Sequence, residues 1–209
     1  MDITYIITVL VIILFSMTLH EAMHGFIAYW LGDDTAKLQG RLTLNPVKHI
    51  DPFLTILLPL MLAVVGGPIF GGAKPVPFNP ARVKYDEWGA ALVALAGPLT
   101  NLIIAFICFG IWVLLGMGSG AVDSTLMIAV LVNLGFFIFN MLPIPPLDGS
   151  RVVYALAPDF VRSGMEAIER YGIVFIFAII LLASKYIGMM MLASIEAIIS
   201  VFQAIFGVL

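Results

Sequence analysis

The first apolar segment of this chain is too long and too poor in charge for the core of a small soluble protein. Residues 3–19 carry no charged side chain, and helix-compatible sequence continues to Leu31, before Gly32, Asp33 and Asp34 end it. A helix over 3–31 would be roughly 43 Å long, which exceeds the roughly 30 Å of a bilayer core. We therefore expect a membrane-spanning helix here.

Composition extends this expectation to the whole chain. Charged residues make up 11% and hydrophobic residues 62% of the 209 residues, whereas a soluble domain has about 25% charged residues. The length fits a single membrane-embedded domain over 1–209. The net charge is −3 and no basic cluster is present, so we expect the lipid bilayer, and not nucleic acid, as the surroundings and partner of the chain.

Further apolar segments follow at about 53–71, 88–116, 124–147, 171–184 and 187–208. They predict an all-α polytopic membrane protein, with a core over about 3–155 and C-terminal helices over about 160–208. Hydropathy leaves open whether the chain crosses the membrane once or twice after residue 171.

Two histidines and a glutamate interrupt the first apolar segment. His20 and His24 lie four residues apart, so both imidazoles would project from one face of a helix and could bind one metal ion. Glu21 is placed to take a proton from a water molecule on that metal. A solvated helix face is the alternative for such a pattern, but ionisable groups are costly inside a membrane unless they function there.

A catalytic zinc site usually has three protein ligands, so a third ligand is expected. Cys108 lies in the middle of an apolar segment and His49 lies in a loop. Asp148, which we expect at the C-terminal end of the fourth segment, is the carboxylate at the right depth. His49 is expected to bond nearby backbone, although a regulatory ligand is the alternative. Glu196, in the last segment, is expected at the interface or paired within the bundle.

The segment over 53–71 could cross the membrane or enter and return. If it is a re-entrant loop with its tip at residues 66–68, nine of the ten basic residues share one side, which the positive-inside rule makes cytoplasmic. The same arrangement puts His20, His24 and Asp148 at one face. We therefore expect a re-entrant loop and a site nearer the cytoplasmic face.

A short β-hairpin is predicted between the first apolar segment and residue 80. Residues 36–46 partly alternate in polarity, and residues 71–80 are rich in glycine and proline. A strand over 38–44 or 73–78 could hold an extended substrate by adding it to a sheet edge. A plain structural hairpin is the alternative.

Three motifs in this order resemble the site-2 protease family of intramembrane zinc metalloproteases. They are residues 20–24, residues 96–101 and residues 140–149, and the resemblance covers about 5–155. It implies Zn²⁺ held by His20, His24 and Asp148, Glu21 as general acid and base, and Asn140 as a group that binds substrate or the oxyanion. Capping near Pro143 is the alternative role for Asn140. Residues 40–52 with 71–79 resemble the membrane-associated β-loops of the family, which implies that the predicted hairpin lies near the active site. PDZ and CBS domains, which many members carry, are absent from these 209 residues, so a minimal member is expected.

The expected function is that of an intramembrane endopeptidase in a prokaryotic cell membrane. Its substrate would be a transmembrane segment of another membrane protein. A metal-ion transporter is one alternative, since intramembrane histidine and aspartate also line ion paths. A catalytically silent module that binds membrane proteins is another.

Overall fold

The computed structural model describes residues 3–57, 60–61 and 72–208. In this part, four helices are long and apolar enough to cross a membrane: α1 (Ile3–Trp30), α4 (Asp86–Leu114), α5 (Ala121–Asn140) and the stretch Lys185–Phe206 of α8 (Gly172–Phe206). The described residues are therefore mostly helical, as predicted, with four candidate membrane spans. The two C-terminal apolar segments form one continuous helix, α8, which contains one candidate span.

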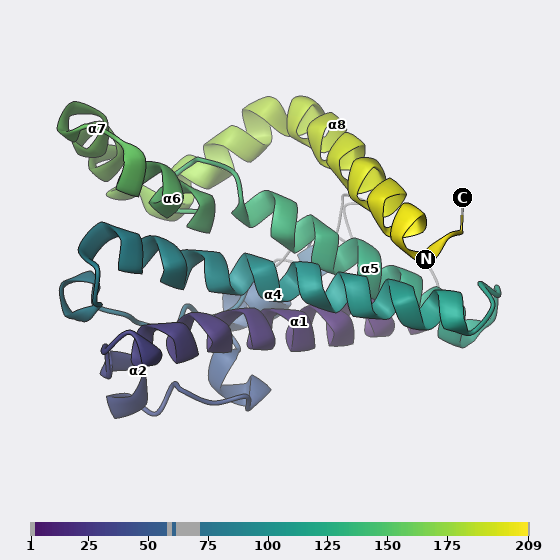
Figure 1. The fold of residues 1–209 in the computed structure, drawn as a ribbon. Helices are drawn as coiled ribbons and strands as arrows, with labels where there is room; N and C mark the ends of the chain where they lie inside the picture. Colours follow the sequence, from purple (N-terminus) through teal and green to yellow (C-terminus); the bar gives the residue numbers. More distant parts are fainter. Residues whose placement is uncertain (1–2, 58–59, 62–71, 209) are drawn as a thin grey trace.

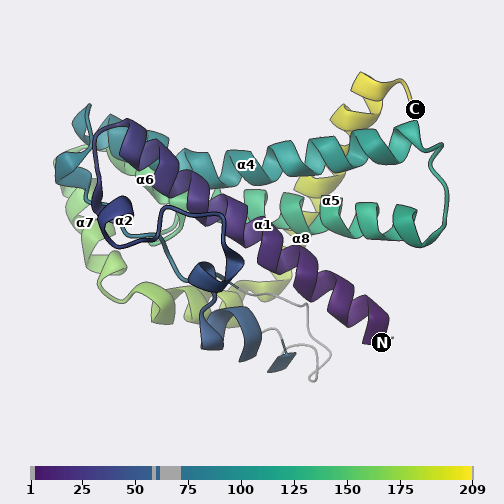
Figure 2. The ribbon, with the colours of Figure 1, turned by 90° about the horizontal axis from the view of Figure 1, so that it is seen from below.

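The helix α4 lies at the centre of the bundle and packs against α1, α5 and α6 (Asp148–Leu156). Its inner face is rich in small residues, which let neighbouring helix backbones approach closely in a membrane. The buried glycines and alanines are Gly89, Ala90, Ala91, Ala94, Gly97, Ala105 and Gly110. Both chain termini and the α4–α5 turn lie at one end of the bundle (Figures 1 and 2). The short helices α2 (Thr35–Leu38), α6 and α7 (Asp159–Glu169) lie at the other end.

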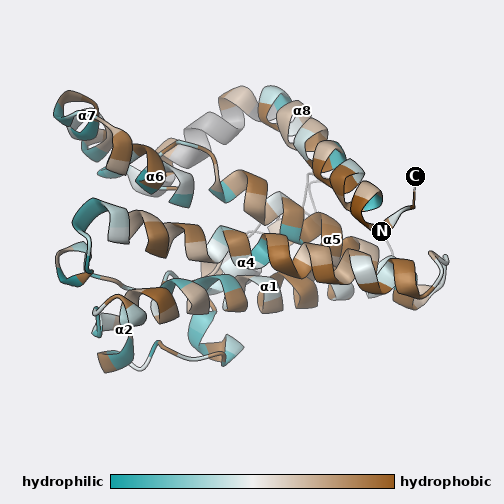
Figure 3. Cartoon of the chain, in the orientation of Figure 1, coloured by the Kyte–Doolittle hydropathy of each residue, from teal (hydrophilic) through white to brown (hydrophobic). Residues whose placement is uncertain are grey.

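Aromatic and branched side chains join α4, α5 and α8. Phe109, Leu134 and Phe202, one from each helix, are buried in a single cluster. The outward faces of the long helices are apolar as well (Figure 3), with Ile7, Ile103 and others exposed. Exposed apolar side chains on every long helix are what a lipid environment requires. Glu196 is exposed on α8 and forms no ion pair with the residues that the structure describes.

The predicted position of Asp148 in its helix is wrong. The helix α5 ends at Asn140, and Asp148 is the first residue of α6. Three prolines between them, Pro143, Pro145 and Pro146, cannot donate the backbone hydrogen bonds that would continue the helix. The carboxylate therefore enters the bundle from the start of a short helix.

The predicted β-hairpin is not found, because no strand occurs in the described residues. Residues 35–38 form α2, and Gly40 turns the chain with φ +63°. The predicted strand over 73–78 lies in the segment 72–79, whose backbone amides bond to separate partners and not to one neighbouring strand. The Lys74 amide donates to the carbonyl of His49 over 2.8 Å, and the Val76 amide donates to a side chain. Pro75 and Pro77 have no N–H, so the edge of this stretch that they share cannot donate hydrogen bonds to a neighbouring strand.

Most of the predicted re-entrant loop over 53–71 lies outside the described residues, including its expected tip at 66–68. The described parts are the short helix η2 (Pro52–Leu57) and residues 60–61. The two flanks are joined: the Thr55 hydroxyl donates to the carbonyl of Gly72 over 2.6 Å. Residues 55 and 72 thus lie side by side.

Candidate metal centre

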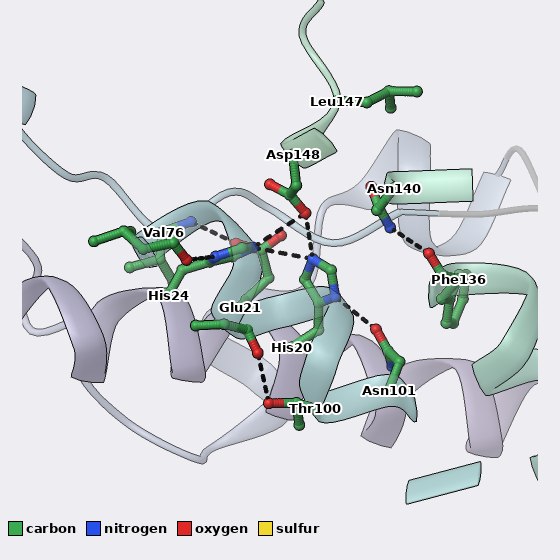
Figure 4. Close-up of polar contacts among 12 residues, drawn as sticks. His20, Glu21, His24, Val76, Thr100, Asn101, Phe136, Asn140, Leu147 and Asp148 are labelled. Carbon is green, nitrogen blue, oxygen red and sulfur yellow. Dashed lines mark hydrogen bonds and ion pairs between the residues drawn. The ribbon is translucent and has the colours of Figure 1, made fainter. Parts of the chain in front are cut away.

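The structure brings three of the predicted site residues together. His20 and His24 lie one turn apart on α1, with their Nε2 atoms 3.0 Å from each other. Oδ2 of Asp148, from the start of α6, lies 3.2 Å from Nε2 of His20 and 3.5 Å from Nε2 of His24. Figure 4 shows the carboxylate facing both imidazoles. The three form a group that could hold a metal ion.

The spacing of these three atoms suits tetrahedral zinc. Zinc bonds to nitrogen and oxygen are about 2.0–2.2 Å long, so two ligand atoms of a tetrahedral site lie about 3.3–3.6 Å apart. The three observed separations are 3.0, 3.2 and 3.5 Å. The donor set, two imidazoles and one carboxylate, leaves a fourth position for water or substrate, as catalytic zinc sites do.

Each histidine uses its other ring nitrogen to bond a different helix. Nδ1 of His24 lies 2.7 Å from the carbonyl oxygen of Val93, and Nδ1 of His20 lies 2.6 Å from Oδ1 of Asn101, both on α4. A carbonyl oxygen only accepts, so Nδ1 of His24 carries the proton and its Nε2 lone pair is available to a metal. Two such lone pairs and a carboxylate at this distance repel one another unless a cation lies among them.

Asp148, the third member of the group, has a carboxyl pKa below its ordinary value. Burial raises this pKa, but the hydrogen bonds and positive charges of His24 and His20 in their protonated forms outweigh burial. The carboxylate is partly exposed, whereas His20, Glu21 and His24 have exposed fractions of 2%, 8% and 9%. Among these four residues, Asp148 is therefore the one that solvent reaches most.

Two glycines make room for this arrangement. A Cβ at Gly97 of α4 would lie 2.4 Å from Nε2 of His24 and 2.6 Å from Nε2 of His20. A Cβ at Gly149 would lie 2.3 Å from the carbonyl oxygen of Met141. Gly97 thus lets α4 approach the ligand atoms, and Gly149 lets Asp148 follow directly after the α5–α6 connection.

Glu21 is buried next to the histidines and accepts a hydrogen bond. Its Oε2 lies 2.8 Å from the amide nitrogen of Val76, which belongs to the segment 72–79 (Figure 4). Pro75 and Pro77 on either side lack an N–H, so Val76 supplies the one amide donor of these three residues. The bond fixes the Glu21 carboxylate beside the metal group.

The structure does not bring Asn140 into the metal group. Its Nδ2 donates to the carbonyl of Phe136, one turn back on α5, over 3.0 Å. Figure 4 shows the side chain to one side of His20 and Asp148. His49 is fully buried in η1 (Pro46–His49), and its Nε2 lies 2.8 Å from the carbonyl oxygen of Thr43. This backbone bond is the role that the sequence favoured.

Other residues of the site were not identified from the sequence. Asn101 bonds His20 and Asn133, Val76 bonds Glu21, and Gly97 borders both histidines. Asn101 and Gly97 belong to the second of the three motifs, but their contacts were not foreseen. A buried partner for Asn133 could have been predicted from the sequence, because a single asparagine within an uncharged apolar run is costly without a hydrogen-bond partner.

Comparison with known proteins agrees with this geometry. The family model described as Peptidase family M50 matches residues 8–119 and 116–184. Three curated relatives carry names of the form "Putative zinc metalloprotease". YwhC of Bacillus subtilis is 43% identical over 97% of this chain and 92% of its own length. Rip2 of Mycolicibacterium smegmatis is 36% identical over 65% of this chain and 52% of its own length. MJ0611 of Methanocaldococcus jannaschii is 43% identical over 47% of this chain and 50% of its own length.

No solved structure gives a significant match to the chain. The family model covers most of the residues, and the YwhC relative covers nearly all of them. The metal group of His20, His24 and Asp148 agrees with the zinc that the relatives' names state. The chain therefore belongs to peptidase family M50, the site-2 protease family of zinc metalloproteases.

Proposed function

We propose that this protein is an intramembrane endopeptidase that cleaves transmembrane segments of other membrane proteins. The observation that carries the proposal is the position of the metal group. His20 and His24 lie within a candidate membrane span, packed against a second span, and an ionisable glutamate stands beside them. Such groups are costly in a membrane and are expected there only where they function.

The roles of the residues follow from their chemistry. His20, His24 and Asp148 would hold Zn²⁺. When bound, zinc supplies a Lewis acid that polarises a water molecule and the scissile carbonyl. Glu21 accepts the proton of the attacking water and delivers it to the leaving amine nitrogen. The Val76 amide holds the Glu21 carboxylate in one orientation during both transfers.

Asn140 is proposed to bind the substrate carbonyl. Its amide nitrogen has two N–H bonds, and the bond to Phe136 uses one of them. The second can donate to a carbonyl oxygen on which negative charge develops. Asn140 is partly exposed, so a substrate backbone can reach it.

The site is proposed to face the cytoplasm, with residues 53–71 as a re-entrant loop. The bond between Thr55 and Gly72 supports a segment that begins and ends on one side. Thiol labelling in intact cells, in a background without Cys108, tests the orientation. Lys84 and Ser119 are both exposed and lie at opposite ends of α4. An impermeant reagent should label Ser119→Cys but not Lys84→Cys; the reverse pattern would overturn the orientation.

The Glu21→Gln variant tests the catalytic proposal. Glutamine keeps an oxygen that accepts from the Val76 amide, so the fold around the site is preserved while the base is lost. With a model transmembrane substrate in liposomes, cleavage should fall about 10²–10⁴-fold. The zinc content should stay at the wild-type level. Cleavage at the wild-type rate would show that Glu21 is not the general base.

A further inference from the structure

A line of buried hydrogen bonds runs from His20 across three membrane helices. Oδ1 of Asn101 on α4 contacts Nδ1 of His20 on α1 at 2.6 Å, and Nδ2 of Asn101 donates to Oδ1 of Asn133 on α5 over 2.8 Å. Nδ2 of Asn133 donates to Oγ of Ser16 and to the carbonyl of Ala129, each over 2.9 Å. Asn101 and Asn133 are fully buried, and Ser16 is 4% exposed.

The Ala129 carbonyl, at the end of the line farthest from His20, determines which atom donates and which accepts in the bonds between Asn133, Asn101 and His20. The carbonyl oxygen of Ala129 can only accept, so the side of the Asn133 amide that faces it is the nitrogen. The Asn133 oxygen then faces Asn101, which must present its own nitrogen there and its oxygen to His20. An oxygen at Nδ1 of His20 requires a proton on Nδ1. The lone pair of His20 therefore lies on Nε2, where the metal group is.

We propose that Asn101 and Asn133 are positioning residues that hold His20 in its metal-binding tautomer. The inference rests on the metal site assigned above and goes beyond it, because Asn133 contacts neither the ligand atoms nor Glu21. It acts only through the orientation of the Asn101 amide. A partner of this kind fixes the ring of a ligand histidine and raises its affinity for a metal.

The two histidines differ in how they are held. His24 bonds the backbone carbonyl of Val93, whose orientation belongs to α4 itself. His20 bonds a side-chain amide, which can turn over and present nitrogen in place of oxygen. A turned Asn101 would favour the His20 tautomer with its proton on Nε2, and that tautomer has no lone pair for zinc. Asn133 prevents the turn, because its oxygen accepts only from the Asn101 nitrogen.

The test compares zinc affinity among three variants by competition with a chelator, with no substrate present. Asn133→Leu removes the group that orients Asn101, and its affinity should fall about 10-fold or more. Ser16→Ala is the matched control: it removes one buried bond of the same line but leaves the Ala129 carbonyl to orient Asn133, so its affinity should stay at the wild-type value.

Asn133→Asp is the rescue variant. A neutral carboxylic acid has a hydroxyl that donates to the Ala129 carbonyl and a carbonyl oxygen that accepts from Asn101, so it keeps the direction of the line. Its zinc affinity should lie close to the wild-type value. If Asn133 only supported the fold, Asn133→Leu and Asn133→Asp would have the same zinc affinity whenever their zinc-free forms are equally stable.

The outcomes separate this inference from the proposed function. Equal zinc affinities for Asn133→Leu and Ser16→Ala would overturn the positioning role, whatever the protein cleaves. Failure of Glu21→Gln to abolish cleavage would overturn the proposed catalysis and leave the zinc affinities as they are. If Asn133→Leu does not fold, Asn133→Ala adds no volume and serves the same comparison, with the same expected loss and the same refuting result.

Discussion

Gly97→Ala should abolish zinc binding by placing a methyl group against the ligand atoms. The added Cβ would lie 2.4 Å from Nε2 of His24 and 2.6 Å from Nε2 of His20, whereas ordinary van der Waals contact begins at 3.4 Å. One or both imidazoles, or α4 itself, must therefore move by about 1 Å. Zinc–nitrogen bonds tolerate only about 0.2 Å. An imidazole that moves by this amount is displaced by several times this tolerance.

The measurement is the zinc content of the purified protein and its zinc affinity against a chelator. Gly97→Ala should hold less than about a hundredth of the wild-type affinity, since a 1 Å misplacement can cost about 10²-fold. Overpacking should also destabilise the zinc-free protein by about 1–3 kcal/mol. Gly135→Ala on α5 is the matched control, because a Cβ there meets nothing within 4 Å. Wild-type zinc affinity in Gly97→Ala would refute the assigned site.

Two further predictions concern the surroundings of the site. Gly149→Ala should weaken zinc binding at least about 10-fold. The added Cβ would lie 2.3 Å from the carbonyl oxygen of Met141 and push the start of α6, with Asp148, away from the histidines. Zinc affinity is measured by competition with a chelator, and an unchanged affinity would contradict this prediction. Asp33 is buried after α1, and its pKa lies below the ordinary value: burial raises it, but hydrogen bonds from the Thr35 hydroxyl and from two backbone amides outweigh burial. Its charged form therefore stabilises the fold at pH values above about 4, the unfolded value, and this stability is lost as the pH falls through the lower folded pKa. Thermal unfolding of the wild type should consequently lose stability below pH 4 more steeply than that of Asp33→Asn, and equal slopes would refute the assignment.

The long helices and the common face of His20 and His24 could be predicted because each depends on local sequence. Charge-free runs define α1, α4 and α5, and the spacing of His20 and His24 fixes their common face. Asp148 could be chosen because few carboxylates lie at the right depth. Its helix was assigned wrongly, since hydropathy continues through the prolines that end α5.

The remaining features depend on contacts between distant residues. Asn101 and Asn133 meet only because α4 and α5 pack in one register, which neither segment determines alone. The bond between Val76 and Glu21 joins residues 55 positions apart. The β-hairpin was predicted from alternation of polarity, but alternation does not reveal that Pro75 and Pro77 lack donors for a ladder.

Residues 72–76 form a short link between two anchored groups. Thr55 holds the carbonyl of Gly72 and Glu21 holds the amide of Val76, so only four peptide steps separate the two anchors. Four residues reach at most about 14 Å when fully extended. Such a short tether has little slack, and Pro75 stiffens it further. The Lys74 amide, which donates to the His49 carbonyl, lies between the two anchors. A force that pulls Gly72 away from Thr55 therefore acts first on that bond and then on the Val76 amide that bonds Glu21.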